Sequence, residues 1–223
     1  MFTGLIESTG TIVSVAQRDG SQRITINAPE IAPKLHTGDS VAVSGVCLTA
    51  LDITSPLFSA DLTAETVART SLAALPPGSN VNLELPTAAG TPLGGHVVQG
   101  HVDATGTLLS LAPVDPSADP AITDWWLRVA VPPVVARYVV EKGSIAIEGI
   151  SLTVARFDRN TPKGDIVSVA IIPHTHAATN LYTLKAGQLL NLEADVLMKF
   201  AEERLKEEPK FELTLEYLVA NGY

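Results

Sequence analysis

The chain has 223 residues, of which 46% are hydrophobic and 17% are charged, and its formal net charge is −9. This composition is typical of a globular protein and excludes a disordered one, and the acidic balance argues against nucleic acid or an anionic membrane as a partner. The single cysteine, Cys47, excludes an intrachain disulfide and a cysteine-based metal site, and it favours a reducing, cytoplasmic compartment.

The N-terminal residues contain no basic segment followed by an apolar run, so we expect no secretory signal. From residue 8 to residue 84 the apolar pattern has the two-residue period of β-strands. Ile24 and Ile26 alternate with polar residues, as do Val81 and Leu83, whereas only residues 66–72 have a helical pattern. Five or six short strands in this length suggest a small closed barrel, because closure removes exposed strand edges. We therefore predict an N-terminal barrel over residues 1–93.

The next part of the chain repeats the first, which indicates a tandem duplication. Four blocks match in the same order: residues 4–11 with 100–107, 40–49 with 144–153, 65–72 with 174–181, and 78–84 with 187–193. The longest uncharged stretch, residues 85–102, precedes and enters the second copy, and its proline, glycine and histidine residues argue against a membrane helix. Residues 113–124 and 158–165 are interpreted as loop insertions of the second copy. We predict a C-terminal barrel over residues 94–194.

The last part, residues 195–223, has a different pattern. Val196, Leu197, Phe200 and Leu205 share one face of a predicted helix that ends before Pro209, and a second apolar stripe follows over residues 211–219. Such a helical tail either packs on its own barrel or joins subunits, and the pattern leaves both alternatives open.

Few residues suggest chemistry by themselves. Cys47 lies in a strand pattern, where a lone cysteine is more often a small buried hydrophobic residue than a nucleophile, but its equivalent in the second copy is Ser151, another small polar group. The segment 94–101 lacks the spacing of a phosphate-binding loop. Its two histidines, His96 and His101, are not a convincing metal pair; one is interpreted as structural and the other as a proton carrier. No metal site is expected.

Equivalent polar positions also differ between the copies. Glu65 corresponds to His174, and Ser44 corresponds to Glu148. Ordinary divergence explains most such differences, although two identical substrates in different chemical roles would require the same divergence.

Several segments together resemble the riboflavin synthase family over nearly the whole chain. They are the start Met-Phe-Thr-Gly-Leu-Ile-Glu, Gly-Val-Cys-Leu-Thr at residues 45–49, Gly-Gly-His-Val-Val-Gln-Gly-His-Val-Asp at 94–103, Gly-Ile-Ser-Leu-Thr at 149–153 and Ile-Pro-His-Thr at 172–175. The resemblance implies an all-β fold of two tandem six-stranded Greek-key barrels with a C-terminal helical tail. It also implies a homotrimer held largely by that tail, with the active site between the N-terminal barrel of one subunit and the C-terminal barrel of its neighbour.

The implied reaction joins two molecules of 6,7-dimethyl-8-ribityllumazine without a cofactor. One lumazine donates a four-carbon unit to the other, which gives riboflavin and 5-amino-6-ribitylamino-uracil. The acidic 7-methyl group of one lumazine supplies the carbon nucleophile, so the protein must mainly hold two flat rings face to face and move protons. The resemblance also suggests an association with lumazine synthase.

The resemblance assigns each barrel a set of ligand-binding residues. The N-terminal set is Gly4, Leu5, Ile6, Cys47, Leu48, Thr49, Asp61, Leu62, Thr63, Ala64, Glu65 and Thr66. The C-terminal set is Gly100, His101, Val102, Lys142, Ser151, Leu152, Thr153, Ile171, Ile172, Pro173, His174, Thr175 and His176. Backbone groups at residues 61–63 and 171–173, on short edge strands, are expected to read the pyrimidinedione. His101 is expected to move protons, while Cys47 and Ser151 stabilise or supply the group that adds to the acceptor ring.

Two residues depart from the family pattern. Ser44 stands where the family often has Asn, and His174 stands where Glu is common, so both are expected to retune binding. The nearest alternative is a non-catalytic lumazine- or flavin-binding antenna protein of the same fold. The presence of Cys47, His101 and Ser151 together with Lys142 favours the enzyme.

Overall fold

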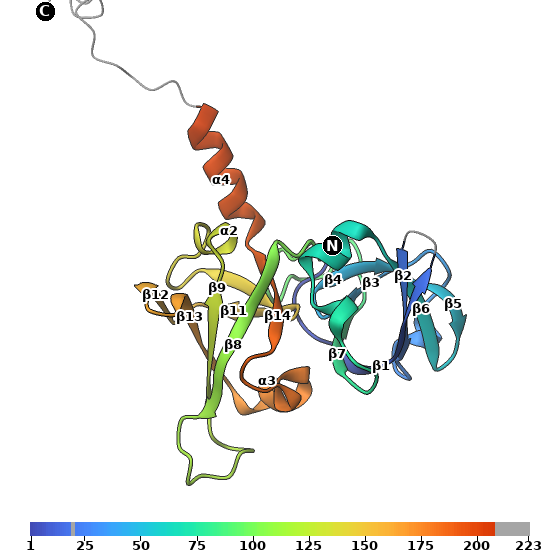
Figure 1. Cartoon of the computed structure of the whole chain (residues 1–223), viewed down its shortest axis with the longest axis horizontal. Coiled ribbons are helices and arrows are strands. Elements are labelled where there is room, and N and C mark those ends of the chain that lie inside the picture. Colours follow the sequence, from blue (N-terminus) through green and yellow to red (C-terminus); the bar gives the residue numbers. More distant parts are fainter. Residues whose placement is uncertain (19–20, 208–223) are drawn as a thin grey trace, which may run out of the picture.

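The computed structural model describes residues 1–18 and 21–207 of the chain. They form two antiparallel sheets that follow one another in sequence, with a helix after the second (Figure 1). The first repeat contains β1 (Ser8–Arg18), β2 (Ser21–Asn27), η1 (Ala32–Lys34), β3 (Ser40–Val43), β4 (Val46–Thr49), β5 (Leu51–Thr54), β6 (Leu57–Leu62), α1 (Ala64–Arg69), η2 (Leu72–Ala74) and β7 (Asn80–Glu84). The second repeat contains β8 (Ala104–Pro113), β9 (Trp125–Val131), α2 (Pro133–Ala136), β10 (Ser144–Ile147), β11 (Ile150–Thr153), β12 (Arg156–Thr161), β13 (Gly164–Ile171), α3 (Pro173–Ala178), η3 (Asn180–Thr183) and β14 (Leu189–Ala194), and α4 (Val196–Glu207) follows it.

The two sheets have the same strand order, which confirms the duplication. The order is β4-β3-β7-β1-β2-β6-β5 in the first sheet and β11-β10-β14-β8-β9-β13-β12 in the second. The last strand of each repeat lies between its first and third strands, as the long return connection of a Greek key requires.

Each sheet curls on itself because its two edge strands are neighbours in sequence. Only Ala50 separates β4 from β5, which lie at opposite edges of the first sheet. The chain therefore bends at Ala50. Before the bend β4 pairs with β3, and after it β5 pairs with β6, so the bend brings the two edges of the sheet together. β11 and β12 do the same around residues 154–155. The seven strands per sheet become the six of the expected barrel when each bent pair is counted as one strand.

The strand period places one apolar face of each sheet inside its barrel. Ile24, Ile26 and Phe58 are fully buried in the first core, and Leu127, Val129 and Val169 are buried in the second. Burial of a side chain of this size contributes about 1.5–3 kcal/mol. The alternation that predicted the strands thus also identifies the core.

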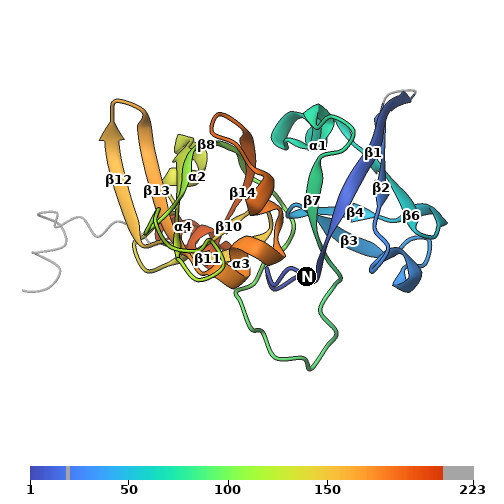
Figure 2. The ribbon, with the colours of Figure 1, turned by 90° about the horizontal axis from the view of Figure 1, so that it is seen from below.

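The two barrels meet around an approximate twofold axis (Figure 2 shows the N-terminus between them). Phe2 and Val98 form a short antiparallel bridge, with N···O distances of 2.7 and 3.1 Å. Gly45 and Gly149 touch back to back: a Cβ on Gly45 would lie 2.7 Å from the Gly149 nitrogen. Only glycine permits this approach, and both residues have positive φ angles, 80° and 78°.

Buried amides repeat the symmetry at the same interface. The Asn82 side chain donates to the Glu148 carbonyl, and the Asn191 side chain donates to the Ser44 carbonyl, each at 2.9 Å. Ser44 and Glu148 therefore belong to the contact between the barrels, where both are buried. Ser44, which differs from the family pattern and was expected to retune ligand binding, thus lies within this contact.

The short helices begin earlier than the sequence predicted. Thr63 caps α1 by accepting from the Thr66 nitrogen at 3.2 Å, so this helix starts at Ala64 and not at Thr66. Pro173 occupies the first turn of α3, where its missing N–H costs nothing, so the predicted start at Thr175 was also too late.

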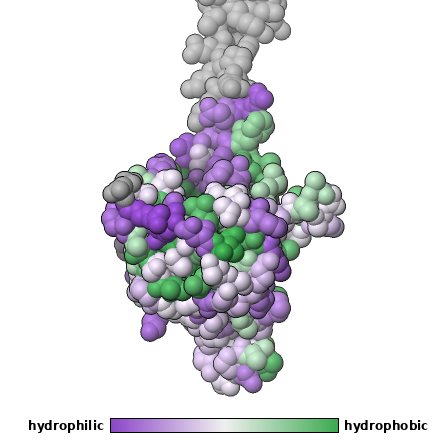
Figure 3. Space-filling view, turned by 90° about the vertical axis from the view of Figure 1, so that its right-hand side faces the viewer, coloured by the Kyte–Doolittle hydropathy of each residue, from purple (hydrophilic) through white to green (hydrophobic). Residues whose placement is uncertain are grey.

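The predicted tail helix is present as α4. It is joined to the second barrel by Lys199, whose Nζ lies 2.7 Å from Asp103, and by the pair Arg137 and Glu202. Its apolar residues Leu197 and Phe200 are 64% and 58% exposed, and Figure 3 shows apolar atoms at the surface of this helix where it leaves the barrels. The second predicted stripe, residues 211–219, lies outside the described residues. Among the helices that the structure describes, none is long and apolar enough to span a membrane.

Candidate functional site

Cys47 lies at the mouth of a cavity on the first barrel. It has a volume of about 340 Å³ and lies between β4, α1 and residues 100–103. Glu65, Thr66 and His101 line it with Cys47, whose side chain is half-buried. The Cys47 nitrogen donates to the Gly100 carbonyl at 2.9 Å. A thiol, a carboxylate and an imidazole thus surround a space suited to a small polar ligand.

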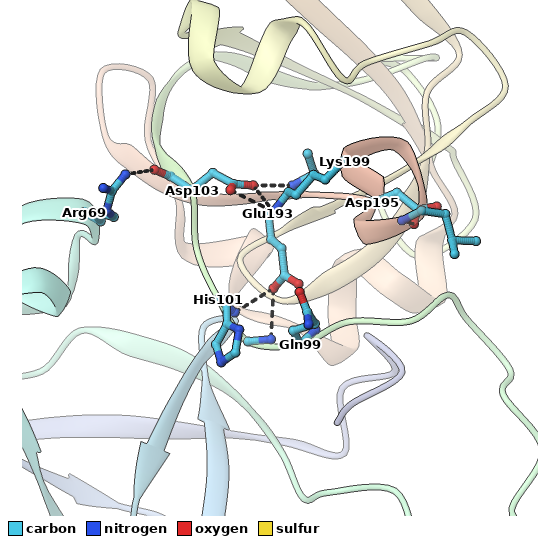
Figure 4. A network of polar contacts seen from close by, with 10 residues as sticks. Arg69, Gln99, His101, Asp103, Glu193, Asp195 and Lys199 are labelled. Atoms are coloured by element: carbon cyan, nitrogen blue, oxygen red, sulfur yellow. Dashed lines mark hydrogen bonds and ion pairs between the residues drawn. The ribbon is translucent and has the colours of Figure 1, made fainter. Parts of the chain in front are cut away.

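Charged groups hold the wall of this cavity in place (Figure 4). Glu193 Oε2 accepts from the nitrogens of Gly100 and His101 at 3.0 and 3.1 Å, and its Oε1 accepts from the Gln99 nitrogen at 2.8 Å. Asp103 pairs with Lys199, and its carbonyl accepts from Arg69 at 3.2 Å. The imidazole of His101 is exposed, so the carboxylate fixes its backbone while the ring can reach a ligand.

Ser151 lies at the equivalent place in the second barrel. Its nitrogen donates to the Gly4 carbonyl at 2.8 Å, and a Cβ on Gly4 would lie 2.6 Å from the Ser151 Cβ. Glu84 mirrors Glu193: its Oε1 accepts from the nitrogen and hydroxyl of Thr3 at 2.6 and 2.8 Å, and its Oε2 accepts from the Gly4 nitrogen at 3.0 Å.

A contact with His96 distinguishes the surroundings of Ser151 from those of Cys47. Its Nδ1 lies 2.7 Å from Ser151 Oγ, and its Nε2 is buried without a hydrogen-bond partner among the described atoms. Burial lowers the pKa of His96, and the negative charge of Asp195 opposes that shift. A neutral imidazole can accept the serine proton, whereas no histidine of the described residues forms such a hydrogen bond with the Cys47 side chain.

Two segments of the expected ligand-binding sets lie at the other barrel from the one to which they were assigned. Gly4, Leu5 and Ile6 were grouped with Cys47, and Gly100, His101 and Val102 with Ser151. Instead, the start of each repeat reaches the other barrel: Gly4 contacts Ser151 and Gly100 contacts Cys47. Ile6 packs on the second core and Val102 on the first. This grouping was wrong because the bridge of Phe2 to Val98 carries both segments across the approximate twofold axis.

The remaining candidates divide between surface and core. Thr49, Thr63, Ala64, Lys142, Thr153, Ile172 and His174 are exposed, whereas Pro173 and Thr175 are half-buried. Leu48, Leu62, Leu152 and Ile171 are buried in the two cores, so only their backbone groups can meet a ligand. Asp61 accepts from Arg23 at 2.6 Å, and this hydrogen bond lowers the pKa of its carboxyl.

The expected edge segments are edges only in part. β6 and β13 lie inside their sheets, but β5 pairs with β6 no further than Ser59, and β12 pairs with β13 no further than Ser168. Beyond those points each strand pairs with one strand only, β6 with β2 and β13 with β9. The ends of β6 and β13 therefore present unpaired backbone groups on one side, which can bind an imide edge.

An aromatic pair packs beside the core of the second barrel. Trp125 and His176 have ring centroids 3.8 Å apart at an angle of 6°, and burial lowers the pKa of His176. Trp125 was not predicted as a site residue, and neither were His96, Glu84 and Glu193. The repeat alignment contained a signal for the last two, because Glu84 and Glu193 occupy equivalent positions.

Known proteins resemble this chain over its length. The family described as lumazine binding domain matches residues 3–86 and 99–195. Riboflavin synthase of Actinobacillus pleuropneumoniae is 41% identical over 227 aligned residues, with 100% of both chains covered. Riboflavin synthase of Mycobacterium tuberculosis is 42% identical, covering 92% of this chain and 98% of that protein, and that of Bacillus subtilis is 35% identical over 100% of both.

Solved structures agree with the fold. The crystal structure of LumP complexed with 6,7-dimethyl-8-(1'-D-ribityl) lumazine has a TM-score of 0.74 and 23% identity, covering 87% of this chain and 99% of that one. The complex of LumP with riboflavin gives the same TM-score at 22% identity. With two matched repeats and full-length relatives above 40% identity, the chain belongs to the lumazine binding domain family and, within it, to the riboflavin synthases.

Proposed function

We propose that the protein catalyses the riboflavin synthase reaction with a site built from the two places around Cys47 and Ser151. Two molecules of 6,7-dimethyl-8-ribityllumazine bind, one on the first barrel (residues 1–93) at the cavity that residues 100–103 also line, and one on the second barrel (residues 94–194) at Ser151, which Gly4 of the first repeat reaches. A four-carbon unit passes between them, giving riboflavin and 5-amino-6-ribitylamino-uracil. No cofactor enters, because the substrates supply both the carbon nucleophile and the electrophile.

The mirrored contacts at Cys47 and Ser151 carry the proposal. Their nitrogens donate to Gly100 and Gly4 at 2.9 and 2.8 Å, so two equivalent frames present different side chains, a thiol and a hydroxyl. Two identical substrates in different chemical roles require this combination of equal geometry and unequal chemistry.

The polar groups then have separate roles. His101, exposed beside Cys47, moves the proton of the 7-methyl group. Ser151, hydrogen-bonded to His96, supplies or stabilises the group that adds to the acceptor ring. The unpaired ends of β6 and β13 bind the pyrimidinedione edges through their backbone groups.

Assembly completes the site. The exposed apolar face of α4 supports a homotrimer in which the tail, residues 195–223, joins subunits, and the first barrel of one copy faces the second barrel of another. The single cysteine supports a cytoplasmic location. Association with lumazine synthase stays a prediction.

The decisive experiment supplies the purified protein with 6,7-dimethyl-8-ribityllumazine alone and follows products by chromatography. We expect riboflavin and 5-amino-6-ribitylamino-uracil in equal amounts, with two lumazines consumed for each pair. Tight binding without riboflavin, in protein shown to be folded, would support the antenna alternative instead. His101→Ala should lower turnover by about a hundredfold or more, and unchanged turnover would remove His101 from its assigned role.

A further inference from the structure

Two buried carboxylates stand behind the proposed sites without lining them. Glu84 ends β7, and Glu193 lies at the equivalent position of β14. Their side chains are 4% and 2% exposed. Burial raises the pKa of both carboxyls, while the backbone N–H groups that donate to them favour the ionised form.

The two carboxylates bind matching segments. Glu84 accepts from Thr3 and Gly4, and Glu193 accepts from Gln99, Gly100 and His101, with both oxygens used in each case. Each carboxylate thus replaces a neighbouring strand for a segment that has little regular pairing of its own. Loss of one acceptor oxygen would leave a buried N–H without a partner.

The held segments have no freedom to shift independently of the other barrel. The Gly4 carbonyl accepts from Ser151 of the second barrel, and the Gly100 carbonyl accepts from Cys47 of the first. Both glycines have positive φ angles, 75° and 79°, and both pack within van der Waals contact of their partner. A displacement of either segment must therefore move the backbone that carries Ser151 or Cys47.

We infer that Glu84 and Glu193 are positioning residues of the proposed transfer, each holding a segment of its own repeat against the reactive side chain of the other barrel. The inference rests on the proposed function. It assigns Glu84 to the geometry of Ser151 and Glu193 to the geometry of Cys47. We call this connection crossed, because each carboxylate acts on the reactive side chain of the other barrel. In the alternative, each carboxylate would affect only the reactive side chain of its own barrel.

The test uses Glu84→Gln and Glu193→Gln in the full chain, since glutamine keeps the shape but replaces one acceptor oxygen by a donor. Glu141→Gln is the matched control, because Glu141 also accepts a backbone N–H, from Phe157 at 2.9 Å, but is exposed and outside the site. Each glutamate variant should lose about tenfold to a hundredfold in kcat with a smaller change in KM. Full activity in either folded variant would overturn the inference.

Two readouts independent of activity test the crossed connection. The rate of Cys47 alkylation by iodoacetamide reports one site, because Cys47 is the only cysteine in the sequence. The NMR titration of the His96 imidazole, assigned with His96→Gln, reports the other. We expect Glu193→Gln to change the alkylation rate at least fivefold and to leave His96 unchanged, and Glu84→Gln to do the reverse. Effects confined to each variant's own barrel, or equal at both sites, would contradict the inference.

These readouts stay informative if the wild-type protein forms no riboflavin, in which case the proposed function fails and the crossed positioning can still hold. Should a variant not fold, amide exchange in the wild-type protein replaces it. The Gly100 and His101 amides should lose protection together as Glu193 is protonated, before global unfolding. Protection that persists until the whole protein unfolds would refute the role of Glu193.

Discussion

His96 shows how a single side chain can separate two nearly equivalent sites. Its Nδ1 is 2.7 Å from Ser151 Oγ, whereas no histidine in the described part of the chain hydrogen-bonds to the Cys47 side chain. The neutral imidazole accepts from the hydroxyl, and the protonated ring cannot. Since burial lowers the pKa of His96, the neutral form persists to lower pH than it would for an exposed histidine.

His96→Gln should therefore lower kcat by about tenfold to a hundredfold, because glutamine cannot take up the serine proton. In the wild type, the part of kcat that depends on His96 should be complete at neutral pH and fall as the pH drops through the lowered pKa. Steady-state kinetics between acid and neutral pH check both points. His36→Gln, at an exposed histidine of the first barrel, is the control. Equal kcat in the two variants would mean that Ser151 acts without His96.

The segments that cross between the barrels explain what the sequence could and could not predict. The strands, the duplication and the tail helix follow from local periodicity and repeated blocks, which do not depend on partners. The contact of Gly4 with Ser151 does not follow, because the repeat alignment is identical whether a segment stays on its own barrel or crosses. The same holds for His96, whose distance from Ser151 is a product of tertiary packing.

A substitution in one crossing segment measures how tightly it is held. A Cβ on Gly100 would lie 2.7 Å from the Cys47 Cβ, and Gly78 has a similar positive φ, 90°, with nothing within 4 Å. Gly78→Ala should therefore cost only the backbone strain, about 1–2 kcal/mol, and Gly100→Ala should cost at least ~1 kcal/mol more through the clash. Denaturant unfolding of both variants gives the difference. Equal losses of stability would show that the segment can move away from Cys47.

The helix α4 carries its own prediction. Leu197 and Phe200 are exposed on the single chain although they are large and apolar, which favours a partner surface in the assembly. Replacing both by serine should convert the proposed trimer to monomer and lower activity with it, because in that trimer the first barrel of one copy faces the second barrel of another. Analytical ultracentrifugation measures the mass. Val114→Ser, at another exposed apolar residue, should leave it unchanged, and a trimer that survives the double substitution would place the interface elsewhere.

The two barrels act as one unit because polar groups are buried between them. Glu148 accepts from the Asn191 nitrogen at 2.7 Å and from the Asn180 side chain at 2.9 Å. Asn82 in turn joins Asn180 and the Glu148 carbonyl, so residues of both repeats share one network. A network of this kind fixes the relative orientation of the barrels only while its members are paired.

The charge of Glu148 sets how this contact depends on pH. Burial raises the pKa of its carboxyl above the unfolded value, so the folded state holds the proton more tightly. Its contribution to stability is complete below the unfolded pKa and is lost as the pH rises through the raised folded pKa. Glu148→Gln removes this titration and the cost of the buried charge, although the new amide presents a donor to one of the groups that donates to the carboxylate.

We therefore expect the melting temperature of Glu148→Gln to fall less than that of the wild type over the pH range above the ordinary pKa of a glutamate carboxyl, since residue 148 then no longer titrates. Differential scanning calorimetry across this range provides the comparison, with Glu30→Gln as the control at an exposed carboxylate. A parallel pH dependence in Glu148→Gln and wild type would mean that the carboxylate is already ionised throughout and that its three donors, not its proton, hold the barrels together. In that case Asn180→Ala, which removes one donor, should lower the melting temperature more than Glu148→Gln, which removes the charge.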